Sequence, residues 1–100
     1  MINQTYIYSL ILIPTEKSRF FDGEEFFIKV VTALKKTAAA CQWHVDDLMH
    51  DDDYVYITVQ VPLEVSVEQL VDILYSDTET SLKMPALWSG DYTVRAVRKG

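Results

Sequence analysis

The sequence predicts an α+β protein with a ferredoxin-like β-α-β-β-α-β order, in which a four-stranded antiparallel sheet carries two helices on one face. Two segments, 4–13 and 54–61, alternate in side-chain character and are rich in β-branched and aromatic residues, as strands are. Two others, 22–40 and 66–75, place apolar residues at helical spacing. Because crossover connections are right-handed, this order puts both helices on the same face. We expect residues 1–100 to form one domain.

The first strand is predicted to be central, because its apolar residues lie on both faces. One face carries Tyr6, Tyr8, Leu10 and Leu12, and the other carries Ile7, Ile11 and Ile13. Pro14 is expected to end it. Asp22 and Glu25 have the spacing of a capping box and are expected to open the first helix. Its predicted core positions are Phe27, Val30, Val31, Leu34 and Ala38.

Two strands, 41–49 and 54–61, are expected around an acidic turn at 50–53. In the second of them, Val55, Ile57, Val59 and Val61 share one face and Tyr54, Tyr56, Thr58 and Gln60 the other. Ser66 and Gln69 repeat the capping-box spacing before a second helix, which should fade in the polar stretch 76–81. A last strand is predicted at 92–97, so the sheet edges are the strands 41–49 and 92–97.

A tyrosine-rich open face is the sharpest functional feature of this arrangement. Taken together, the strand patterns place Tyr6, Tyr8, Tyr54, Tyr56 and Tyr92 on the face without helices, with Leu10 and Leu12 uncovered. Exposed aromatic residues on such a sheet can stack on the bases of RNA or single-stranded DNA. Alternatively, a protein partner or a second copy of the chain covers the face.

The charge balance argues against nucleic acid without deciding the matter. The net charge is −6, whereas proteins that bind nucleic acid usually carry a basic surplus. Much of the acid is concentrated in one region, which we interpret as a solvated turn, at Asp46, Asp47, Asp51, Asp52 and Asp53. The lone Cys41 excludes an internal disulfide and favours a cytoplasmic protein. No apolar run reaches the ~20 residues that span a bilayer, so no membrane association is expected.

Four segments resemble the single-tyrosine HUH transposases of insertion sequences and the related repeat-associated transposases. They are Tyr6-Ile7-Tyr8-Ser9-Leu10 with Thr15-Glu16-Lys17-Ser18-Arg19, then Asp53-Tyr54-Val55-Tyr56-Ile57, then Val61-Pro62 with Ser66-Val67-Glu68-Gln69-Leu70-Val71, and Leu87-Trp88-Ser89-Gly90-Asp91-Tyr92-Thr93-Val94. The resemblance implies a DNA-binding, ferredoxin-like fold and dimerisation through joined sheets. It also implies basic contacts to a DNA hairpin just after the first strand, where Lys17 and Arg19 stand.

The departures from that family concern its chemistry. The family holds a divalent metal with two histidines at the positions of Tyr54 and Tyr56, and a later helix supplies the attacking tyrosine. Tyrosine ionises only near pH ~10, so it is a poor substitute for neutral imidazole. We expect the nucleophile helix to be absent, since few residues follow the last strand. The resemblance therefore implies a degenerate member without metal, cofactor or cleavage activity, in which Tyr54 and Tyr56 are vestigial.

The sequence thus predicts a catalytically inactive, transposase-like module that binds a DNA or RNA hairpin or a single strand, or acts in regulation. Lys17, Arg19 and Arg95 are the predicted nucleic-acid contacts. The rival hypothesis is a protein-interaction or dimerisation domain without nucleic-acid binding, and a small-ligand sensor is a weaker third. A homodimer is expected in either of the first two cases. His44, Asp46 and His50 are metal-ligating residue types, but their spacing matches no ligand pattern.

Overall fold

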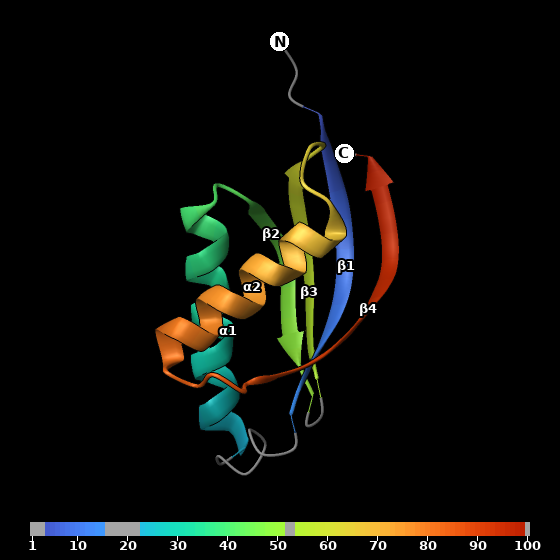
Figure 1. Cartoon of the computed structure of the whole chain (residues 1–100). Coiled ribbons are helices and arrows are strands. Elements are labelled where there is room, and N and C mark those ends of the chain that lie inside the picture. The colour runs from blue at the N-terminus through green and yellow to red at the C-terminus, as the bar shows by residue number, and fades with distance from the viewer. Residues whose placement is uncertain (1–3, 16–22, 52–53, 100) are drawn as a thin grey trace.

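The computed structural model describes residues 4–15, 23–51 and 54–99. The elements follow the predicted order: β1 (Thr5–Pro14), α1 (Gly23–Ala40), β2 (His44–His50), β3 (Val55–Pro62), α2 (Val67–Leu82) and β4 (Trp88–Lys99). The strands form one sheet in the order β2-β3-β1-β4, and every neighbouring pair is antiparallel. Figure 1 shows α1 and α2 on the same side of this sheet. The predicted α+β, ferredoxin-like fold is confirmed.

The central pair of strands sets the two faces of the sheet. Leu10 lies opposite Ile57, and Tyr8 lies opposite Val59, so these side chains point toward the helices. The helix-facing side chains of β1 and β3 that are fully buried are Leu10, Leu12, Val55, Ile57, Val59 and Val61. From α1 and α2 the core receives Phe26, Phe27, Val30, Leu34, Leu70, Val71 and Leu74. The face of β3 predicted to be apolar is therefore the buried one.

The orientation predicted for β1 was wrong. Tyr6, Tyr8, Leu10 and Leu12 face the helices, and Leu10 and Leu12 are fully buried instead of uncovered. Tyr92 lies opposite Leu12 and therefore also faces the helices. The cause is that β1 is apolar on both faces, so alternation alone cannot say which face is covered. Ile7, Ser9 and Ile11 occupy the open face in their place.

Helix α2 extends beyond its predicted end, through the polar stretch 76–81, to Leu82. Thr78 lies fully buried in this stretch, and its hydroxyl donates to the Leu74 carbonyl at 2.6 Å. The same oxygen accepts a hydrogen bond from the indole Nε1 of Trp88 at 2.8 Å. The predicted capping box at the other end is confirmed, with Ser66 and Gln69 in reciprocal hydrogen bonds. The hydrogen bond with Trp88 thus stabilises the end of α2, whose residues have a low helix propensity of their own.

Tyr75 holds the beginning of β4 against α2. Its ring stacks on Trp88, with centroids 4.8 Å apart, and its hydroxyl donates to the Asp91 carbonyl at 2.8 Å. Burial raises the pKa of the Tyr75 phenol well above its ordinary value. These contacts explain why β4 begins at Trp88 and not near Tyr92, where it was predicted.

Strands β2 and β4 form the edges of the sheet, as predicted. No helix within residues 23–51 and 54–99 is long and apolar enough to cross a membrane. The predicted cap residue Asp22 lies outside the described residues.

We expect Thr78→Val to lower the free energy of unfolding by about 1–3 kcal/mol, because it leaves the buried Trp88 indole N–H without an acceptor. Valine keeps the shape of threonine, so the loss reports the hydrogen bond and not a cavity. Urea unfolding followed by circular dichroism measures it. Thr80→Val, at an exposed position of the same helix, is the matched control and should change little. Equal effects of the two substitutions would contradict the role assigned to Thr78.

Candidate nucleic-acid interface

A groove of about 600 Å³ crosses the open face of the sheet. We call it the open-face groove; its lining residues are Ser9, Ile11, Asp47, Met49, Tyr54, Tyr56, Arg95 and Ala96. All four strands contribute to it, and Tyr54 immediately precedes β3. The two predicted vestigial positions, Tyr54 and Tyr56, and one predicted contact, Arg95, therefore meet in one place.

A chain of hydroxyl groups forms the centre of this face. Ser9 lies opposite Thr58 in the pairing of β1 with β3, and their hydroxyl oxygens are 3.1 Å apart. Thr58 also donates to the Tyr56 phenolic oxygen at 3.3 Å. Residues two apart on a strand are ~6.6 Å apart. The Tyr56 side chain must therefore lean along the strand to reach Thr58, which leaves its ring lying over the sheet instead of projecting into solvent.

These contacts also change the acidity of Tyr56. Hydrogen bonds from the Ser9 and Thr58 hydroxyls lower the pKa of the Tyr56 phenol below its ordinary value, because they stabilise the phenolate. The charge of Arg95 acts in the same direction, whereas partial desolvation and the carboxylate of Asp47 oppose it. The central residue of the groove is thus electrostatically coupled to the residues at both of its ends.

Two β-bulges flank the Ser9–Thr58 pair. On β4, Ser9 pairs with Ala96 and Leu10 with Val94, so Arg95 is the extra residue. On β2, Val45 pairs with Val59 and Asp47 with Thr58, so Asp46 is the extra residue. Bulges re-aim side chains at sheet edges and are common beside functional sites. Here they bring Arg95 to one end of the groove and Asp47 to the other.

The acidic residues do not behave as the single solvated turn that was predicted. Asp46 and Asp47 belong to β2, and Asp47 lines the groove. The predicted strand 41–49 already included Asp46 and Asp47, but the sequence did not show that Asp47 faces the groove, because a bulge shifts the alternation of every residue that follows it. Ser9 and Thr58 were also missed as site residues, although a small hydroxyl residue in each of the two central strands was a detectable signal.

The two histidines lie on different faces and do not share a site. His44 Nε2 is 3.0 Å from an Asp46 carboxylate oxygen, beside Gln60 on the open face. His50 instead stacks on Phe27, with ring centroids 4.7 Å apart. Among the residues described, no three His, Cys, Asp or Glu side chains gather closely enough to hold a metal ion.

The open-face groove itself does not fit the divalent metal that the resembling family holds. Its polar side chains are hydroxyls and phenols apart from the carboxylate of Asp47 and the guanidinium of Arg95. A hard divalent ion prefers several carboxylate or imidazole ligands and is repelled by a neighbouring cation. Lys17 and Arg19, the other predicted nucleic-acid contacts, lie outside the described residues.

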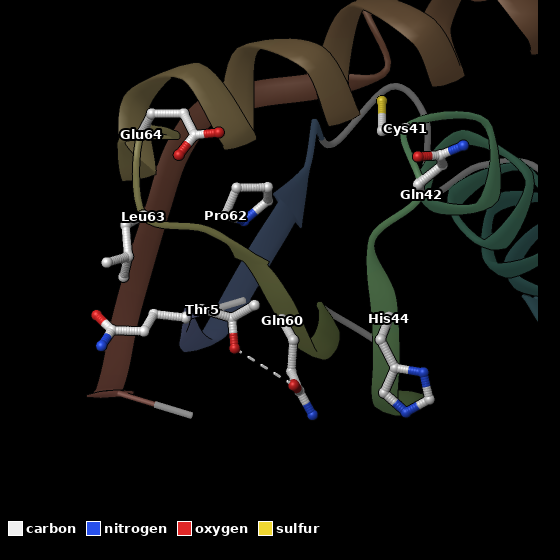
Figure 2. Close-up of a pocket in the computed structure, with 9 residues that line it drawn as sticks. Thr5, Cys41, Gln42, His44, Gln60, Pro62, Leu63 and Glu64 are labelled. Atoms are coloured by element: carbon white, nitrogen blue, oxygen red, sulfur yellow. Dashed lines mark hydrogen bonds between the residues drawn. The ribbon is translucent and has the colours of Figure 1, made fainter. Parts of the chain in front are cut away.

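A second hollow lies at the other end of the sheet, between the end of α1 and the turn before α2 (Figure 2). Its chemistry-bearing side chains are Cys41, His44 and Glu64, and Figure 2 shows Cys41 and Glu64 on opposite sides of it. Burial, with a smaller effect from Asp77, raises the pKa of the Cys41 thiol. A thiol with a raised pKa is a poor nucleophile at neutral pH, so Cys41 is not activated for nucleophilic chemistry in this hollow.

The fold is similar to that of solved transposase structures. A crystal structure of a candidate transposase from Deinococcus radiodurans R1 superposes with a TM-score of 0.76, at 16% identity, over 94% of this chain and 80% of that one. A REP-associated tyrosine transposase bound to a REP hairpin superposes with a TM-score of 0.66, at 8% identity, over 97% of this chain and 58% of that one. No protein-family profile matches the sequence, and no curated protein matches it either.

We expect the Tyr56 phenol to titrate below its ordinary pKa of ~10, and Ser9→Ala to move it back upward by removing a donor to the phenolate. NMR titration of the ring carbon bonded to the phenolic oxygen, assigned with Tyr56→Phe, measures the pKa. Ser89→Ala, an exposed serine at the start of β4, is the control and should leave it unchanged. A Tyr56 pKa that Ser9→Ala does not alter would contradict the hydroxyl chain.

Proposed function

We propose that this chain is a transposase-like domain that has lost DNA cleavage and binds nucleic acid, as a hairpin or a single strand, through the open-face groove. The observation that carries the proposal is the meeting of Tyr54, Tyr56 and Arg95 in one groove on the uncovered side of a transposase-type sheet. Aromatic rings that stack on bases and a cation that contacts phosphate are the two components of single-strand binding sites.

Exposure of apolar surface beside the tyrosines supports a binding role for this face. Met49 lies opposite Tyr56 on the neighbouring strand, and 53% of its surface is exposed. A flexible thioether beside aromatic rings is typical of surfaces that adapt to a ligand. Stacking on π-faces also tolerates a negative net charge better than phosphate contacts do, so the −6 charge of the chain favours a stacking mode.

Loss of cleavage follows from the donor set of the groove. The metal-assisted reaction of the resembling family needs an ion that polarises the phosphate and a positioned nucleophile. Tyr54 and Tyr56 stand where that family has its imidazoles, and a phenol is a poor substitute for a neutral imidazole as a ligand of a divalent ion. We propose that the two tyrosines have exchanged a metal-binding role for a stacking role.

A titration with hairpin and single-stranded DNA tests the proposed binding. Tyr56→Ala should weaken binding roughly 5- to 150-fold, since stacking contributes about 1–3 kcal/mol per base. Arg95→Ala should weaken it and lower the slope of log K against log salt by about one. Lys36→Ala, which removes a charge from the exposed side of α1, is the control. Absence of binding at low salt, or equal binding by all variants, would overturn the proposal.

We expect no cleavage of hairpin-bearing single strands by the chain in magnesium or manganese, because the groove lacks a metal-binding set of ligands. Gel analysis of end-labelled DNA measures this. Cleavage product that disappears in Tyr54→Phe or Tyr56→Phe would show that a phenol acts as nucleophile or ligand, and would refute the loss of activity.

The alternative is a protein-interaction or dimerisation domain without nucleic-acid binding. It is favoured by the edge strand β4, whose residues from Arg95 to Lys99 are all exposed. An exposed edge offers backbone groups for pairing with another chain. The homodimer expected from the sequence stays a prediction, which sedimentation equilibrium tests. Because a dimer is expected under both functions, it is the DNA titration that separates them.

A further inference from the structure

We propose that the open-face groove binds one unpaired guanine of a nucleic-acid strand and that the Asp47 carboxylate selects it. This inference rests on the proposed nucleic-acid-binding function and adds its base preference. The observation behind it is a pair of opposite charges, Asp47 and Arg95, that form no ion pair with each other. They lie at the two ends of the groove, with the aromatic ring of Tyr56 between them.

Asp47 differs from its neighbour Asp46 in its availability. Asp46 accepts hydrogen bonds from the Gln60 amide at 3.0 and 3.1 Å and lies 3.0 Å from His44. Asp47 has no such partner among the described side chains, although it lines the same face. A carboxylate with two free oxygens in a groove can accept two parallel hydrogen bonds from a ligand.

Arg95 is likewise available to a ligand. In the part of the chain that the structure describes, it forms no ion pair with Asp47 or with any other carboxylate. The two residues stand on opposite edge strands, three inter-strand spacings or roughly 14 Å apart at the backbone. The separation prevents them from neutralising each other, so the groove presents an acceptor at one end and a cation at the other.

A nucleotide has the matching arrangement of charge. Its phosphate is an anion for Arg95, its base is a flat ring for Tyr56, and its base edge reaches beyond the ring toward Asp47. The hydrogen bond between Tyr56 and Thr58 holds the phenol ring over the sheet before a ligand arrives, which reduces the entropy lost on binding.

Guanine is the base that Asp47 fits. Its Watson–Crick edge carries two adjacent donors, N1–H and the N2 amino group, which suit the two carboxylate oxygens. Adenine and cytosine place a ring acceptor beside their amino group, and thymine places carbonyls beside its single N–H. These acceptors would face the carboxylate and repel it. An acidic residue in a nucleic-acid groove normally weakens binding, because it repels phosphate. Guanine is the base with which the Asp47 carboxylate would instead form a favourable interaction.

The test uses the full chain and fluorescently labelled thymidine hexamers that carry one central guanine, inosine, adenine or cytosine, titrated by anisotropy at low salt. We expect the guanine hexamer to bind about tenfold more tightly than the adenine and cytosine hexamers, since a bidentate contact is worth about 1–3 kcal/mol. Inosine lacks the N2 amino group and should lose most of this advantage.

Asp47→Asn separates base selection from a structural role. The amide can offer only one acceptor oxygen, so the guanine preference should disappear, while affinity for the adenine and cytosine hexamers should rise because a negative charge is removed. Asp72→Asn, an exposed aspartate of α2, makes the same charge change away from the groove and should keep the preference. Circular dichroism confirms that both variants fold.

The outcomes distinguish this inference from the function on which it rests. Equal binding of all four hexamers by the native chain, or a guanine preference that survives Asp47→Asn, overturns the inference and leaves nucleic-acid binding intact. Failure of every hexamer and hairpin to bind overturns both.

Discussion

The register between β1 and β3 is the constraint on which the rest of the structure depends. Six side chains of this central pair, three of which are Leu10, Leu12 and Ile57, are fully buried against the helices. Burial of such a side chain stabilises the folded state by about 1.5–3 kcal/mol, so the set contributes as much as the whole net stability of a typical domain. A slip of one residue would turn the set toward water. The register is therefore determined by the core, and it fixes which residues of β1 and β3 lie on the open face.

The open face of β1 and β3 carries polar residues because burial of the apolar side chains on the other face leaves the alternate residues pointing away from the helices. Once Leu10 and Ile57 face the helices, Ser9, Tyr56 and Thr58 must face away from them. Ser9 and Thr58 satisfy each other across the strands, and Tyr56 completes the chain of hydroxyls. A phenol that would otherwise be free to rotate is held against the sheet. Packing on one face of the sheet thus organises a ligand-sized groove on the other.

The two edge strands contribute the charged residues of the groove, and each strand has a β-bulge at or beside its charged residue. A regular β2 and β4 would alternate strictly, and the bulges at Asp46 and Arg95 interrupt that alternation beside the Ser9–Thr58 pair. The fold is shared with transposases of low sequence identity, but a shared fold does not establish a shared activity. The groove of this chain carries phenols, hydroxyls and two separated charges, and this chemistry is the basis of the function that we propose for it.

The sequence by itself determined the order of the elements, the capping box at Ser66 and the open-face positions of Tyr54 and Tyr56. These features depend on local spacing or on strict alternation with buried valines and isoleucine, which a sequence displays directly. Only the tertiary structure decided which face of β1 is buried, since both of its faces are apolar. It also decided the length of α2, because the hydrogen bond that sustains its end comes from Trp88, ten residues beyond Thr78. The tertiary structure also decided that Asp47 faces the groove, because the β-bulge that turns it there is not visible in the local sequence pattern.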